Sequence, residues 1–65
     1  MAITLARARN LAYDAVMIAD WSTALHWYTY ALAHLPAGYG LHPYERDDIA
    51  NMKEWVRTIH IEHGL

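Results

Sequence analysis

The segment from Trp21 to Leu35 constrains the fold more than any other part of this sequence. Its apolar residues recur at steps of three and four without interruption, which is the period of one helix face. Asp20, just before it, suits the cap of a first helical turn, and Pro36, just after it, cannot continue a helix. The pattern predicts a helix over residues 21–35 with an apolar stripe of Trp21, Ala24, Leu25, Tyr28, Ala31, Leu32 and Leu35.

The first helix of the chain is predicted before this segment, over residues 3–18, with Thr4 as its N-terminal cap. Small side chains on its apolar side would let a neighbouring helix approach closely, as ridge-into-groove packing requires. We therefore expect these two helices to form a tight antiparallel hairpin. The expected apolar side consists of Leu5, Ala8, Leu11, Ala12, Ala15 and Ile18.

A third helix is predicted over residues 43–62, after a loop that holds most of the prolines and glycines of the chain. Pro43 suits the first position of this helix, and Gly64 suits the position just after its end. No β-type alternation occurs, so we predict one all-α domain of three helices over residues 1–65. The expected inward residues of the third helix are Ile49, Met52, Val56 and Ile59, with Trp55 on the flank.

The segment DWSTALHWYTYALAHLP resembles the second-helix half of a tetratricopeptide repeat, through Asp20, Trp21, Ala24, Tyr28, Ala31, Leu32 and Pro36. In the first helix, Leu11 and Ala12 stand where that family has its Leu-Gly or Leu-Ala pair, whereas Ala8 and Ala15 replace bulkier family residues. Ala19 replaces the usual turn glycine, so we expect a differently conformed turn, because alanine resists positive φ. The resemblance implies a single degenerate helical hairpin, completed by the third helix or by a second copy.

Composition limits the classes of function. A net charge of −2 offers no positive surface for a phosphate backbone, so we do not expect nucleic acid as a partner. No apolar run approaches the length that spans a bilayer and no signal peptide is recognised, so we expect a cytoplasmic protein with no membrane partner. A chain of 65 residues has a small core, and without cysteine no disulfide can support it. Self-association is another source of stability for so small a domain, so we expect a homo-oligomer.

The sequence gives little support for catalysis or metal binding. His26 near Ser22 or Thr23 could suggest a base and a nucleophile, but no separate oxyanion site is evident, so we expect no catalytic residues and no enzyme activity. His60 and His63 could share a metal ion, yet no known metal motif surrounds them, and we expect no metal and no cofactor.

Two surfaces are candidates for contact with a protein partner. If the repeat geometry holds, the ligand-facing side of the first helix carries Arg9, Tyr13 and Met17. The second helix carries another aromatic row with Trp27 and Tyr30, which either lies under the third helix or forms an interface. We therefore expect a non-catalytic protein-interaction module that self-associates or docks a larger protein through Arg9, Tyr13, Met17, Trp27 and Tyr30.

Two alternatives stay open at this point. One is a small regulatory or inhibitor protein of a mobile genome that acts on a host protein or on DNA. A third helix that begins with Glu45, Asp47 and Asp48 does not resemble a basic recognition helix. The other is a helical protein that binds a metal through histidine.

Overall fold

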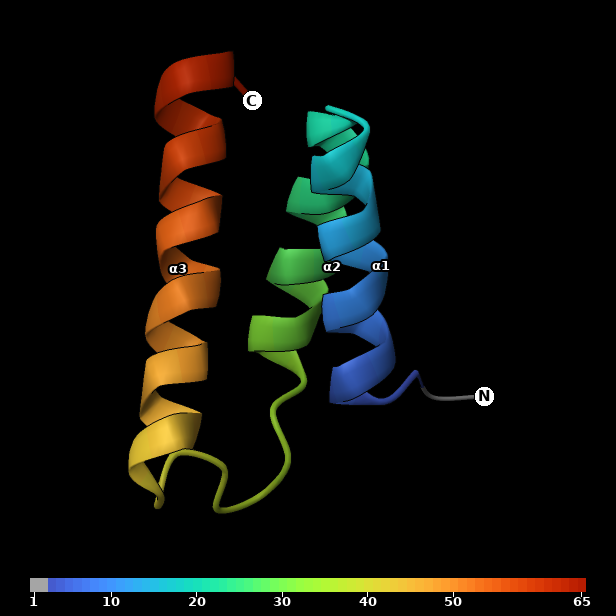
Figure 1. The fold of residues 1–65 in the computed structure, drawn as a ribbon. Helices are drawn as coiled ribbons and strands as arrows, with labels where there is room; N and C mark the ends of the chain where they lie inside the picture. The colour runs from blue at the N-terminus through green and yellow to red at the C-terminus, as the bar shows by residue number, and fades with distance from the viewer. Residues whose placement is uncertain (1–2) are drawn as a thin grey trace.

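The computed structural model describes residues 3–65 and contains three helices, as the sequence predicts. They are α1 (Leu5–Met17), α2 (Trp21–Ala33) and α3 (Pro43–His63), and they run alternately up, down and up (Figure 1). Helix α2 packs against both α1 and α3. The all-α, three-helix fold is thereby confirmed.

Helix α1 is shorter than the predicted range of 3–18 at both ends. The backbone N–H of Arg7 donates a hydrogen bond to Thr4 Oγ1 at 3.2 Å, so Thr4 caps the helix as expected. At the other end the N–H groups of Ala19 and Asp20 donate to the carbonyls of Val16 and Ala15, at 3.0 and 2.9 Å. This pair of bonds is a Schellman motif, which satisfies carbonyls that the helix end leaves free.

The turn after α1 differs from the expectation for Ala19. Its φ of 57° is positive, so the alanine adopts the left-handed conformation that glycine usually supplies. The two Schellman hydrogen bonds hold the backbone in this conformation despite the steric cost of Cβ. Alanine therefore does not redirect the turn, and the prediction of a differently conformed turn was wrong in this respect.

Helix α2 begins where the sequence predicts, because the N–H of Thr23 donates to Asp20 Oδ1 at 3.4 Å. It ends at Ala33, two residues before the predicted end. The cause is Pro36, whose ring disfavours helical backbone in the residue before it, so the helix ends ahead of Leu35. Leu35 nevertheless stays half-buried against the core.

Two tight turns carry the chain from α2 to α3. The N–H of Tyr39 donates to the carbonyl of Pro36 at 3.0 Å, and Gly38, the third residue of this turn, has a φ of 79°. Glu45 then fixes the start of α3, since its Oε1 accepts from the backbone N–H groups of Gly40 and His42. The helix extends one residue past the predicted end, and Gly64 after it has a φ of 68°.

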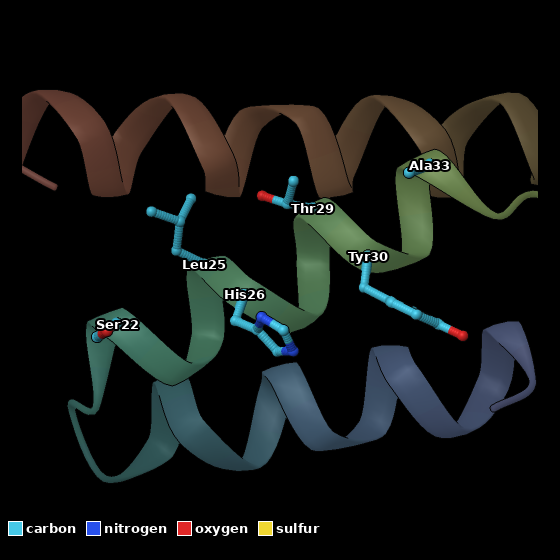
Figure 2. A pocket seen from close by; sticks show the side chains of 6 residues that line it. All are labelled: Ser22, Leu25, His26, Thr29, Tyr30 and Ala33. Carbon is cyan, nitrogen blue, oxygen red and sulfur yellow. The ribbon is translucent and has the colours of Figure 1, made fainter. Parts of the chain in front are cut away.

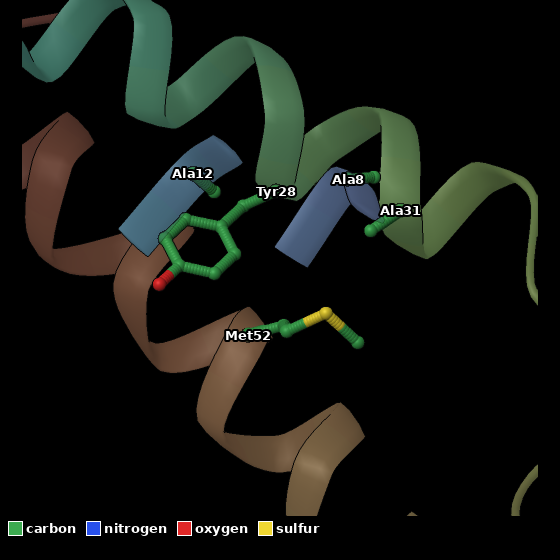
Figure 3. Close-up of a cluster of buried hydrophobic side chains, with 5 residues drawn as sticks. All are labelled: Ala8, Ala12, Tyr28, Ala31 and Met52. Atoms are coloured by element: carbon green, nitrogen blue, oxygen red, sulfur yellow. The ribbon is translucent and has the colours of Figure 1, made fainter. Parts of the chain in front are cut away.

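Small side chains dominate the core. Among the described residues, the buried apolar side chains are Ala8, Ala12, Ala15, Ala24, Tyr28, Ala31, Met52 and Ile59. Figure 3 shows Tyr28 and Met52 filling the space between the alanines and helix α3. Ile18, predicted on the apolar side of α1, is 75% exposed, because it follows the last helical residue and its backbone leaves the helical path.

Candidate protein-interaction surface

The first predicted contact surface lies on one side of α1. Arg9, Tyr13 and Met17 follow one another at steps of four residues and therefore share a helix face. The side chain of Tyr13 is 53% exposed and that of Met17 is 68% exposed. The structure thus leaves a tyrosine and a methionine open to solvent one helical turn apart; we call this pair the α1 stripe.

Arg9 has a partner within the chain. Its Nη1 lies 2.7 Å from Asp48 Oδ2, and the same carboxylate oxygen accepts a hydrogen bond from the Tyr39 hydroxyl at 2.5 Å. The Asp48 side chain is only 16% exposed, whereas that of Arg9 is 39% exposed. One carboxylate therefore connects α1, the loop and α3, and Arg9 holds these elements together at the foot of the α1 stripe.

The phenols near this carboxylate have raised pKa values. The hydrogen bond to Asp48 is the main cause for Tyr39, whose pKa lies above its ordinary value of 10.0. Burial is the main cause for Tyr28, with smaller upward contributions from Tyr13 and Asp48 and a downward one from Arg9. Both phenols therefore stay neutral at physiological pH, so that Tyr39 keeps the proton it donates to Asp48.

The second predicted surface, Trp27 and Tyr30, is partly covered. Both side chains are half-buried and pack against the core cluster that contains Ala8, Ala12 and Met52. Their rings meet edge to face at 5.7 Å between centroids, and Tyr30 in turn stacks on His34 at 4.1 Å. Trp27 thus belongs in part to the core, while one side of the aromatic row reaches the surface.

Helix α3 approaches α2 through other aromatic residues. Trp55 of α3 stacks with Tyr28 at 6.2 Å and with Trp21 at 6.5 Å, and His63 stacks on Trp21 at 4.1 Å. The sequence placed Trp55 only on the flank of α3. Stacking of this kind adds to the energy of area burial, so these four rings strengthen the α2–α3 contact that Met52 and Ile59 also make.

The outer side of α2 carries a shallow depression of about 400 Å³ (Figure 2). Figure 2 shows Leu25 and Thr29 inclined toward α3, and His26 and Tyr30 inclined toward α1. A second, smaller depression of about 260 Å³ lies on α3 beside Trp55. The first depression is lined entirely by α2, by Ser22, Leu25, His26, Thr29, Tyr30 and Ala33.

The histidines take part in packing and local bonds. His26 meets the ring of Trp27 edge to face at 4.8 Å, and no hydrogen bond within residues 3–65 joins it to Ser22 or Thr23. His34 Nδ1 lies 2.9 Å from the carbonyl oxygen of Tyr30 on its own helix. In the part of the chain that the structure describes, no three His, Asp or Glu side chains gather as metal ligands would.

Comparison with known proteins identifies no family or related structure for this chain. No protein-family model, no curated protein and no solved structure matches the chain. Among residues 3–65, no helix is both long enough and apolar enough to cross a membrane. The likeness to a tetratricopeptide hairpin thus stays a prediction, and the functional argument depends on the surfaces described above.

Proposed function

We propose that this chain is a non-catalytic protein-interaction module that docks a helix or peptide of another protein on the α1 stripe. The observation that carries the proposal is the distribution of large apolar side chains. Within residues 3–65, Met52 and Ile59 are the largest side chains that are fully buried, while Tyr13, Met17 and five other large apolar side chains are at least half exposed. A partner that covers part of this area would add to a small core.

The chemistry of the α1 stripe suits a protein partner. Tyrosine supplies apolar area with one hydroxyl, and methionine adapts its flexible side chain to irregular surfaces. The Arg9–Asp48 ion pair lies one turn away and fixes α1 relative to α3, so the stripe is displayed on a rigid support. A rigid support lowers the entropy cost of binding. The single-hairpin resemblance agrees with this role, since helical repeats bind ligands on such faces.

Site-specific photo-crosslinking tests the proposal. A photoreactive phenylalanine derivative is placed at position 13 and, as the matched control, at the exposed position of Lys53 on α3. In cells that naturally produce the protein, we expect position 13 to give one discrete adduct that position 53 does not give. Adducts of equal yield and pattern at both positions, or none at position 13, would contradict docking on the α1 stripe.

A further inference from the structure

Charge is distributed unevenly along the chain. All five Lys and Arg residues and all seven Asp and Glu residues lie outside residues 21–44. Helix α2 therefore carries no Asp, Glu, Lys or Arg on any face. At a protein surface, the side of a helix that faces water usually carries charged or polar residues, and a helix that is hydrophobic all round is buried.

Within residues 3–65, two sides of α2 are covered by other helices. Helices α1 and α3 lie on either side of it, and the remaining side forms the shallow depression shown in Figure 2. Ser22, His26, Thr29 and Ala33 on that side are exposed. The open side of this helix is therefore exposed to solvent, and it carries no Asp, Glu, Lys or Arg.

The spacing on this open side suits a helix partner. Ser22, His26, Thr29 and Ala33 follow one another at steps of four, three and four, which is the spacing of the contact line between two packed helices. Their side chains are mostly small, so that another helix could approach closely. Leu25 and Tyr30, both half-buried, border the line on the α3 side and the α1 side and add apolar area.

We propose that a second copy of this chain covers this side, with the two α2 helices antiparallel about a two-fold axis. The absence of charge argues for this occupant. A partner with charged residues would bury them against α2 without a counter-charge, which is costly, whereas an uncharged partner surface would not. A second copy supplies an identical one, and near a two-fold axis any charge would face its own copy. The outer faces of α1 and α3 are less suited to this contact because they carry charged residues. These are Arg7 and Asp14 on α1, and Lys53 and Glu54 on α3.

The α2 surface is separate from the α1 stripe, so self-association and partner docking can each fail without the other. The test is the molar mass of the purified full chain, measured by light scattering after gel filtration over a range of concentrations. The wild type is compared with Thr29→Lys, which places a charge near the middle of the contact line, and with Asn10→Lys, an exposed position on α1. Lysine favours helix more than threonine does, so Thr29→Lys is expected to fold, which circular dichroism checks.

We expect the wild type and Asn10→Lys to be dimers, and Thr29→Lys to have a dissociation constant higher by about tenfold or more. Mixing Thr29→Lys with Thr29→Glu should restore dimers, because opposite charges then meet across the axis. If Thr29→Lys dimerises as tightly as the wild type, another surface forms the dimer and the inference is wrong. A wild type that stays monomeric up to about 1 mM also overturns it, while crosslinking at position 13 decides the docking role separately.

Discussion

The guanidinium of Arg9 and the carboxylate of Asp48, 39 residues apart in the chain, form an ion pair with an Nη1–Oδ2 distance of 2.7 Å. The Tyr39 hydroxyl donates to the same oxygen. Because the carboxylate and the guanidinium are partly shielded from water, we expect their interaction to stabilise the fold more than a fully exposed ion pair would. This contact connects the first helix to the third, which share no extensive backbone contact.

Asp48→Asn tests that contact. The substitution removes the negative charge that pairs with Arg9 and accepts the hydrogen bond of Tyr39. We expect the free energy of unfolding to fall by about 1–2 kcal/mol. Urea unfolding followed by circular dichroism measures the change. The matched control is Glu54→Gln, since Glu54 pairs with Arg57 at 3.7 Å on an exposed surface. This control should shift stability by less than about 0.5 kcal/mol, and equal losses in both variants would contradict a special role for Asp48.

Acid should destabilise the chain in part through Glu45. Backbone hydrogen bonds, first from His42, hold the pKa of Glu45 below its ordinary value of 4.5. The folded state therefore binds this proton less readily than the unfolded state. The stability that these bonds contribute is complete above the ordinary pKa and is lost as the pH falls through the folded pKa.

We expect the melting temperature to drop between about pH 5 and pH 3, and the drop to be smaller in Glu45→Gln. Thermal unfolding at several pH values measures it, with Glu62→Gln as the control for an exposed glutamate at the far end of α3. If Glu45→Gln shows the same pH dependence as the wild type, the N-terminal hydrogen bonds of α3 do not contribute to acid stability.

Met52→Ala should be the most damaging of the truncations considered, because Met52 is fully buried between the alanines of α1 and α2. Removal of a buried methionine side chain costs about 2–5 kcal/mol, a large share of the stability of a small domain. Ile61→Ala is the control, since Ile61 on the same helix is 68% exposed. Chemical denaturation should separate the two variants clearly, and similar losses would show that the core is not where the structure has it.

The sequence predicted the helices better than the contacts between them. The Asp20 cap, the alanine stripe of α1 and the Pro43 start depend on neighbours within one or two turns, so a single sequence reveals them. The ranges predicted for α1 and α2 extended beyond the ends that the helices have in the structure. In α2 the restriction by Pro36 acts on the residue before the proline. In α1 the Schellman motif ends the helix at Met17, with the left-handed Ala19 just beyond it.

The candidate site was predictable only in part. Spacing places Tyr13 and Met17 on one exposed face, as the structure finds. The pairing of Arg9 with Asp48 was missed, because residues 39 positions apart meet only through the packing of α2 between α1 and α3. The sequence did not predict the hydrogen bond of Tyr39, whose only local feature is its place between Gly38 and Gly40. Both glycines have positive φ, and the two tight turns that this permits position the Tyr39 hydroxyl.

Ala19→Gly is expected to stabilise the chain. Ala19 has a φ of 57°, which costs a residue with a Cβ about 1 kcal/mol, and glycine removes that strain while it loses some entropy on folding. We expect a gain of up to about 1 kcal/mol in the free energy of unfolding. Ala50→Gly, at an exposed position inside α3, should instead lose about 1 kcal/mol, because glycine disfavours a helix interior. Losses in both variants would contradict the left-handed turn.

Oxidative footprinting of Met17 tests the docking proposal most directly. In the purified protein Met17 is 68% exposed and should oxidise readily, whereas the fully buried Met52 should react slowly. In intact cells that naturally produce the protein, a partner on the α1 stripe should slow oxidation of Met17 while Met52 keeps its low rate. If Met17 oxidises as fast in the cell as in the purified protein, relative to an exposed reference side chain such as Tyr44, no partner covers the α1 stripe.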